Sequence, residues 1–190
     1  MIKYIIALKF VIFGRSQELF YYWKSEIIRR PYFSIIRLLR EKKLRHRNFL
    51  FWWRLANEMY KNGGKYQKRA AIKLNNKIIE RFGCEIGLGA NIGKGLLIPH
   101  HSGIVIHGSV DIGDNLIIRQ NCVIDKDCKS LRLTIGNNVD IGANTCIIGL
   151  SVKIGDNVKI GAMSFIKSNI PSNCTYVTEK KSRIIVSPSS

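Results

Sequence analysis

The sequence predicts a mainly β protein: a parallel β-helix of six-residue repeats, preceded by a basic α-helical region. Two observations carry this prediction. Over the first 81 residues, apolar side chains recur three and four positions apart, which is the period of an amphipathic helix. From Cys84 to Ile166 the helical period is replaced by a period of six. We therefore expect a helical region at 1–83, a β-helix domain at 84–170 and a C-terminal tail at 171–190.

The helical region divides at recognisable breaks. Pro31 is suited to opening a helix or a turn. The run Asn62-Gly63-Gly64 is a break, and a last helix from about Tyr66 to Phe82 would lead into the repeats. The apolar positions that support the earlier helices are Ile35, Ile36, Leu38 and Leu39, then Trp52, Trp53, Leu55 and Met59.

In the second region isoleucine recurs every six residues, usually with glycine after it and a small or aliphatic residue two positions before it. The glycine would turn a corner where a larger side chain or a restricted φ does not fit. Three six-residue units would close one coil, so that residues 18 apart stack, as in other solenoids. The register is interrupted between Ile104 and Ile112, at Asp125–Arg132 and at Leu150–Ser151. The isoleucines are at 86, 92, 98 and 104, at 112, 118 and 124, at 135, 141 and 147, and at 154, 160 and 166.

Positive charge is concentrated before the repeats. Of the net +18, residues 1–83 hold 20 Lys and Arg against 5 Asp and Glu, and residues 84–190 hold 11 against 8. A solvated helical face and a peripheral contact with an anionic membrane both explain this block, and the apolar cluster at 49–53 after the basic run at 37–47 keeps the membrane alternative open. We expect no nucleic-acid binding, because no reading motif accompanies the charge.

Targeting and metal signals are weak. No apolar run is long enough to span a bilayer, and Lys9 interrupts what would be a signal peptide, so we expect a cytoplasmic protein, with the inner face of the membrane as an alternative location. The number of cysteines, five, is odd, and no pair of them has the spacing of metal ligands. We therefore expect no metal and a reducing compartment.

The segments 92–106, 112–121 and 135–166 resemble the hexapeptide-repeat acyltransferases, which form left-handed parallel β-helices. Within them the chain looks most like the serine acetyltransferase branch, which includes O-acetyltransferases of capsule and exopolysaccharide assembly such as the colanic acid type. The resemblance implies acetyl-CoA as co-substrate and a homotrimer.

The resemblance also implies a catalytic residue. Alignment through Ser102-Gly103-Ile104-Val105-Ile106 makes His100 the general base and Glu85, where the family usually has Asp, the carboxylate that orients it. A hydroxyl is a poor nucleophile at neutral pH, so a base must take its proton as it attacks the thioester of acetyl-CoA, in a direct transfer.

The acceptor residues depart from the serine enzymes. Pro99 stands where the family has Asp, and Gln120 follows Arg119 at the position that the resemblance gives to a second His. We assign acceptor binding to Arg119, Gln120 and His101. These departures favour a sugar hydroxyl of a bacterial surface polysaccharide as acceptor, with serine O-acetylation as the alternative and a non-catalytic binding or scaffold protein as an alternative from another class.

Two further implications concern acetyl-CoA and zinc. The family's Gly-Ala corners for acetyl-CoA are matched by Gly142-Ala143 and Gly161-Ala162, and Lys167 and Arg183 would meet its phosphates, although the usual Gly-Asn-Pro-Ala turn before that arginine is replaced by Glu179-Lys-Lys-Ser182. The zinc carbonic anhydrases share this type of coil, but the spacing of His101 and His107 does not match their close histidine pair.

Overall fold

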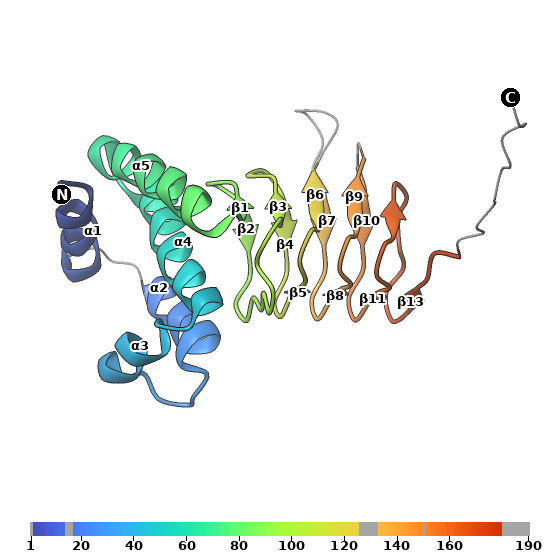
Figure 1. Cartoon of the computed structure of the whole chain (residues 1–190), viewed down its shortest axis with the longest axis horizontal. Helices are drawn as coiled ribbons and strands as arrows, with labels where there is room; N and C mark the ends of the chain where they lie inside the picture. Colours follow the sequence, from blue (N-terminus) through green and yellow to red (C-terminus); the bar gives the residue numbers. More distant parts are fainter. Residues whose placement is uncertain (1, 14–16, 126–132, 150, 180–190) are drawn as a thin grey trace, which may run out of the picture.

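A computed structural model describes residues 2–13, 17–125, 133–149 and 151–179. The helices gather at one end of the molecule, and the coils stack away from them toward the C-terminus (Figure 1). The helical end comprises α1 Ile2–Phe13, α2 Gln17–Tyr22, the π-helix η1 Trp23–Ile28, α3 Ile35–Glu41, α4 Arg45–Asn62 and α5 Lys65–Phe82. The predicted break at 62–64 separates α4 from α5 and is confirmed.

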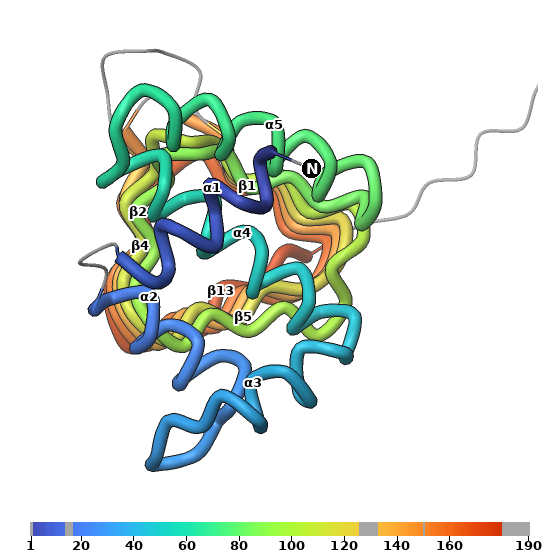
Figure 2. The backbone as a smooth tube through the Cα atoms, turned by 90° about the vertical axis from the view of Figure 1, so that its left-hand side faces the viewer, coloured from blue at the N-terminus to red at the C-terminus, as the bar shows by residue number. Residues whose placement is uncertain are grey.

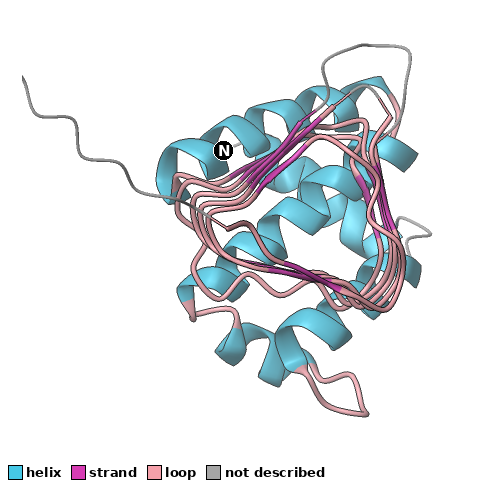
Figure 3. Cartoon of the chain, turned by 90° about the vertical axis from the view of Figure 1, so that its right-hand side faces the viewer, coloured by secondary structure: helices cyan, strands magenta, loops and turns pink. Residues whose placement is uncertain are grey.

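The repeats form three parallel sheets that meet as a triangular prism, which is seen end-on in Figure 3. The first sheet contains β1 Glu85–Ile86, β3 Val105–Ile106, β6 Val123–Asp125, β9 Cys146–Ile148 and β12 Phe165–Ile166. The second contains β2 Asn91–Ile92, β4 Asp111–Ile112, β7 Thr134–Ile135 and β10 Lys153–Ile154. The third contains β5 Ile117–Ile118, β8 Asp140–Ile141, β11 Lys159–Ile160 and β13 Thr175–Tyr176.

Isoleucines fill the prism in columns, because each short strand turns one side chain inward. In the first sheet Ile86, Ile106, Ile124, Ile147 and Ile166 are paired in register and all are at most 1% exposed. The stacked apolar column excludes water along the whole axis, which is the main source of stability in a solenoid.

The register corrects one sequence assignment. Ile104 was placed in the isoleucine column, but Ile86 pairs with Ile106, so the first coil has 20 residues where the next, from Ile106 to Ile124, has 18. The carbonyl of Ile104 instead accepts a hydrogen bond from the N–H of Glu85, and Glu85 directly precedes Ile86, the first residue of the column. The two additional residues lie in the corner that precedes Ile104, and this corner contains His100.

The corners confirm one of the two expected reasons for glycine, the lack of space for a side chain, and not the other. The glycines that follow the isoleucines do not have positive φ; they are required by space, since a Cβ on Gly142 would lie 2.5 Å from the backbone N of Ala162. Positive φ is supplied at the first coil by Gly89, Gly95 and Gly103, and at the later coils mostly by asparagine, whose short polar side chain tolerates the left-handed region. Asn115, Asn138 and Asn157 form such a stack, joined through their side-chain amides at 2.9 Å in each step.

The first coil is capped by helix α4 through buried polar contacts. Trp53 Nε1 donates to the carbonyl of Ile86 at 3.0 Å, and Asn57 Nδ2 donates to the carbonyl of Ala90 at 3.0 Å. Arg54 donates to the carbonyls of Ile92 and Gly93, which would otherwise be unsatisfied at the end of the solenoid. These contacts hold the helices and the first coil in one arrangement.

Two expectations on domain limits can be compared with this arrangement. The solenoid passes the predicted limit at residue 170, because β13 pairs with β11 and extends the third sheet to Tyr176. The predicted tail beyond 179 and most of the interrupting loop at 125–132 lie outside the described residues. Among the helices that the structure describes, none is long and apolar enough to cross a membrane.

Candidate active site

The predicted acceptor residues and the two Gly-Ala pairs fall on one edge of the prism, between the third and first sheets. We call this edge the site column; it comprises residues 99–103, 119–121, 142–144 and 161–163 in successive coils. Backbone hydrogen bonds join neighbouring corners: Asn121 donates to Ser102, Asn144 to Gln120 and Met163 to Ala143, at 3.0, 3.0 and 2.8 Å. Residues that are far apart in the sequence therefore form a continuous strip.

His100 lies in the longest corner of this column. Pro99 precedes it, and Gly103 ends the corner with a φ of 70°. The side chain of His100 is exposed, while Ile98 and Ile104 on either side are fully buried. The two additional residues thus make the chain protrude at this corner and present an accessible imidazole beside Arg119–Asn121 of the next coil.

His101 has a different environment from His100. It is 7% exposed, its ring packs edge-on against Phe82 of α5 with centroids 5.6 Å apart, and its Nε2 has no hydrogen-bond partner among the described residues. Burial lowers the pKa of His101, and the positive charges of Arg45, His46 and His100 lower it further. A neutral, buried imidazole is suited to supporting the corner and less suited to binding an acceptor, so the predicted acceptor role of His101 is not supported by its position.

His46 is a neighbour of this corner that the sequence analysis did not identify. It lies in the first turn of α4, and burial together with Arg47, Arg29 and His100 lowers its pKa. His46 and His100 are 54 positions apart in the chain. The clustering of three histidines depends on how α4 and α5 pack on the first coil, and the only sequence signal was the basic run in which His46 lies.

Glu85 and His100 are not joined in this structure. Glu85 begins β1, its side chain is exposed, and no hydrogen bond or ion pair connects it to another described side chain. It lines a hollow of about 410 Å³ on the first sheet together with His107 and Asp125. His107 Nδ1 accepts the N–H of Ser109 at 3.0 Å. The predicted Glu85–His100 contact is therefore absent from the described chain, although both residues belong to the first coil.

Arg119 and Gln120 both lie in the site column, but they differ in availability. The guanidinium of Arg119 pairs with Asp140 of the next coil and donates to the carbonyl of Ile141 at 3.3 Å. The hydrogen bond from Asp140 raises the pKa of Arg119. Arg119 is thus engaged within the fold, and its role in acceptor binding stays a prediction. Gln120 Oε1 is buried without a hydrogen-bond partner among the described residues, so a ligand donor would satisfy it.

The predicted acetyl-CoA residues divide into three groups. Gly142, Ala143, Gly161 and Ala162 continue the site column below Gln120 and present only backbone and methyl groups there. Lys167 follows β12 and therefore lies at the opposite end of the first-sheet strand, with its Nζ 5.1 Å from the Phe165 ring centroid. Arg183 lies outside the described residues. Backbone groups without side chains in front of them fit the approach of a long thin ligand, so the column fits this part of acetyl-CoA.

Cationic side chains gather beside the histidine cluster. Lys43, Arg45 and Arg81 line a hollow of about 250 Å³ together with Asn48 and Phe82. Phe82 is the ring that contacts His101, so the hollow adjoins the site column. No carboxylate lines it, and none of the three cations has an ion-pair partner within the described ranges. An anionic group of a substrate would be attracted here.

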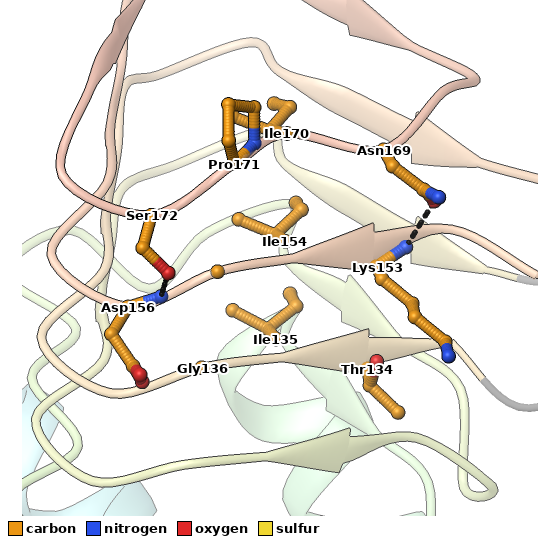
Figure 4. A pocket seen from close by; sticks show the side chains of 11 residues that line it. Thr134, Ile135, Gly136, Lys153, Ile154, Asp156, Asn169, Ile170, Pro171 and Ser172 are labelled. Atoms are coloured by element: carbon orange, nitrogen blue, oxygen red, sulfur yellow. Dashed lines mark hydrogen bonds between the residues drawn. The ribbon is translucent and has the colours of Figure 1, made fainter.

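A larger hollow lies on the second sheet, away from the site column (Figure 4). Its volume is about 560 Å³, and its ionisable side chains are Lys153 and Asp156. The backbone N–H groups of Lys153 and Asp156 already donate to the side chains of Asn169 and Ser172 (dashed in Figure 4). These polar groups therefore stabilise the coil itself. We place the site at the histidine corner because histidine is the commonest general base in proteins. The hollow on the second sheet is lined by no histidine, and its carboxylate, Asp156, already accepts the N–H of Asn137 at 2.6 Å. Within the described part of the chain, no group of three or more His, Cys, Asp or Glu could hold a metal ion.

Comparison with solved structures identifies the fold. The serine acetyltransferase of Neisseria gonorrhoeae in complex with serine superposes with a TM-score of 0.72 at 26% identity, covering 93% of this chain and 71% of that one. Serine acetyltransferase isoform 3 of Entamoeba histolytica, in complex with cysteine, gives a TM-score of 0.66 at 25% identity, covering 95% of this chain and 63% of that one. The chain has the fold of the serine acetyltransferases. The predicted left-handed β-helix with N-terminal helices is confirmed.

Sequence comparison also finds serine acetyltransferases. The mitochondrial serine acetyltransferase 3 of Arabidopsis thaliana is 35% identical over 127 residues, which are 65% of this chain and 32% of the relative. The chloroplastic serine acetyltransferase 1 of the same plant is 34% identical over 99 residues, 50% of this chain and 31% of the relative. The chain thus spans about a third of the length of these curated relatives. No family profile matches it. The finer resemblance to colanic acid O-acetyltransferases is not supported, since the relatives found are serine acetyltransferases.

Proposed function

We propose that the chain is an acetyl-CoA-dependent O-acetyltransferase and that serine is its acceptor. The single observation that carries the proposal is the site column, in which an exposed histidine stands above a strip of bare Gly-Ala corners. Its fold neighbours include a serine acetyltransferase that was solved with serine bound. The preference for a sugar acceptor that Pro99 and Gln120 suggested is not supported by these comparisons, which favour the serine alternative.

The chemistry follows from the groups in the column. The imidazole of His100 accepts the proton of the acceptor hydroxyl as the oxygen attacks the thioester carbonyl of acetyl-CoA. The tetrahedral intermediate collapses, the C–S bond breaks, and the proton held by the imidazole passes to the departing thiolate of CoA. A positioned base contributes about 10²–10⁴-fold to such a reaction. The exposed position of His100 leaves room for both substrates to meet there.

The cationic hollow provides a place for the carboxylate of serine. Lys43, Arg45 and Arg81 carry positive charge next to Phe82 and His101, and Arg119 is occupied by Asp140. In this chain, therefore, we assign recognition of an acceptor anion to the helical region and not to Arg119.

A sugar hydroxyl is a second candidate acceptor, and one observation favours it. Pro99, directly before His100, has no side-chain carboxylate to pair with the ammonium group of an amino acid, whereas the resemblance gives this position to Asp. An uncharged or acidic sugar does not need such a group.

The test is release of the CoA thiol from acetyl-CoA with serine, free sugars, nucleotide sugars and surface polysaccharide as acceptors. We expect serine to respond and His100→Ala to lose at least about a hundredfold in kcat. The matched control is His107→Ala, which removes an imidazole from the following corner, at the start of the next coil. A response to sugars alone would replace serine by the second candidate. Undiminished activity of His100→Ala would contradict the mechanism, and no release with any acceptor would favour a non-catalytic scaffold.

A further inference from the structure

The helical end of the molecule exposes large apolar side chains on two neighbouring helices. On α1, Leu8 and Ile12 are each 60% exposed, and on α3, Ile35 and Ile36 are 60% and 77% exposed. Single exposed apolar residues are common on soluble proteins, but a contiguous patch marks an interaction surface. The complete set on these helices is Ile2, Tyr4, Ile5, Leu8, Ile12 and Phe13, followed by Ile35, Ile36 and Leu39.

We call the exposed apolar residues of these two helices, together with the hollow between them, the α1–α3 face. Tyr4 and Leu8 of α1 and Ile35 and Leu39 of α3 line the same hollow of about 370 Å³. Its other walls are apolar or aromatic apart from Lys42, whose Nζ lies 4.6 Å from the ring centroid of Phe51. Figure 2 views the molecule from the helical end, with α1 toward the viewer and the coils behind it. The face therefore lies at the opposite end of the solenoid from the last coil.

The spacing on α1 suits a helix that lies flat on a surface. Ile5, Leu8 and Ile12 are three and four positions apart, so they follow one side of the helix, while Ala7 and Phe10 on the other side are buried in the protein. Twelve residues of helix span about 18 Å, which is shorter than the hydrocarbon core of a bilayer. An insertion limited to the headgroup boundary is the geometry that such a helix allows.

The charge around the face is positive. Residues 1–44 contain 10 Lys and Arg against 3 Asp and Glu. Two of these acids already have cationic partners, since Glu26 is buried against Arg54 and Glu41 pairs with Arg40 and Arg47 at the surface. Lys9 and Arg37 are exposed, which leaves their charge free to act on a partner. Two copies of this face brought together would oppose like charges, whereas an anionic surface would be attracted.

We infer that the α1–α3 face docks on an anionic lipid bilayer, with its apolar side chains at the level of the headgroups and the solenoid projecting away from the membrane. The observation that carries this is the joint occurrence of a contiguous apolar hollow and an unneutralised basic surround on the same short helices. The inference is independent of the proposed enzymatic function, because it uses none of the site column.

The experiment is co-sedimentation of the full chain with vesicles of phosphatidylcholine alone and of phosphatidylcholine mixed with phosphatidylglycerol. We expect binding to the anionic vesicles, at least about tenfold weaker binding to the neutral ones, and a further loss on raising the salt concentration. The double variant Leu8→Glu with Ile36→Glu should lose binding to both. Its matched control is Val177→Glu, which places the same charge at an exposed apolar residue of the last coil and should bind like the wild type.

Circular dichroism and thermal melting verify that the variants fold, and Ile36→Glu alone replaces the double variant if that one does not. Equal binding to both vesicle types would overturn the inference, as would binding that the Glu substitutions leave unchanged. A chain that binds no vesicles but sediments as an oligomer, and becomes smaller in the Leu8→Glu and Ile36→Glu variant, would show that a second copy covers the face.

Discussion

Arg54 of α4 and Glu26 of η1 form a fully buried ion pair at the junction of the helices and the first coil. The guanidinium donates to both carboxylate oxygens, at 3.0 and 2.5 Å, and also to the carbonyls of Ile92 and Gly93. Glu26 in turn accepts the N–H of Leu96 at 3.1 Å. Burial raises the pKa of Glu26, and Arg54 opposes that rise. The pair therefore closes the end of the solenoid that carries Glu85 and His100.

We predict that Arg54→Met destabilises the chain by about 3–5 kcal/mol, because it leaves the Glu26 carboxylate buried without its counter-charge. Urea unfolding followed by circular dichroism measures this change. The double variant Glu26→Leu with Arg54→Met should recover little, because the carbonyls of Ile92 and Gly93 and the N–H of Leu96 still lose their partners. A matched control is Lys94→Met, which breaks the exposed pair with Asp114 and should change stability little. A double variant as stable as the wild type would show that the backbone groups find other partners.

The histidine cluster should make stability fall in mild acid. The pKa values of His46 and His101 both lie below the ordinary 6.5, so the unfolded chain binds protons more readily than the folded one. Their contribution is therefore fully present above about pH 6.5 and is lost as the pH falls below it. We expect the urea midpoint to decrease between pH 7.5 and pH 5.5.

The variant His101→Phe separates this effect from other acid effects. It keeps a ring against Phe82 and removes the titrating group, so its urea midpoint should depend less on pH over that interval than the wild-type midpoint. The variant His107→Phe, at a histidine outside the cluster, serves as the control and should keep the wild-type pH dependence. An unchanged pH dependence in His101→Phe would mean that His101 is not protonated on unfolding in this range.

The cationic hollow gives a prediction on substrate recognition. If Lys43 and Arg81 attract the carboxylate of the acceptor, the double variant Lys43→Gln with Arg81→Gln should raise the KM for serine about tenfold or more and leave kcat nearly unchanged, which is the pattern of lost uniform binding. The KM for acetyl-CoA tests whether the hollow serves the acceptor alone, and it should not change. Lys159→Gln, at an exposed lysine of the third sheet, is the control for loss of general positive charge. A KM for serine that does not respond would remove the hollow from the site.

The sequence was sufficient for the fold because each coil repeats a local rule. Ile86, Ile106 and Ile124 lie at the centre of the prism because every strand has only one inward position, and six residues return the chain to the next face. The same rule misplaced Ile104, since a corner with two additional residues shifts the register without changing the composition. Interruptions of the period are visible in a sequence, but the corner that absorbs them is fixed only by strand pairing.

The candidate site was less predictable because it depends on contacts between elements. His100 lies on an accessible corner, and Gln120 and the Gly-Ala pairs share its column, but the catalytic role of His100 stays a prediction. The engagement of Arg119 by Asp140 was not visible, because these residues are 21 positions apart and meet only when coils stack. The approach of His46 to His100 also required the packing of α4, for which no repeat exists.

The asparagine stack at the corner between the second and third sheets supports a last prediction. Asn138 has a φ of 56°, accepts a hydrogen bond from the Asn115 amide and donates to Asn157, at 2.9 Å each. Asn138→Ala removes both bonds, at about 0.5–1.5 kcal/mol each, and puts a residue that disfavours the left-handed region in its place, at about 1–2 kcal/mol. We therefore expect a loss of about 2–5 kcal/mol in urea unfolding. Asn138→Gly is the matched control, because glycine adopts this φ freely. It should recover the part of the unfolding free energy that the Ala variant loses through the unfavourable φ. If the Gly and Ala variants are equally unstable, the stack stabilises the corner through its hydrogen bonds alone, and the backbone argument is wrong.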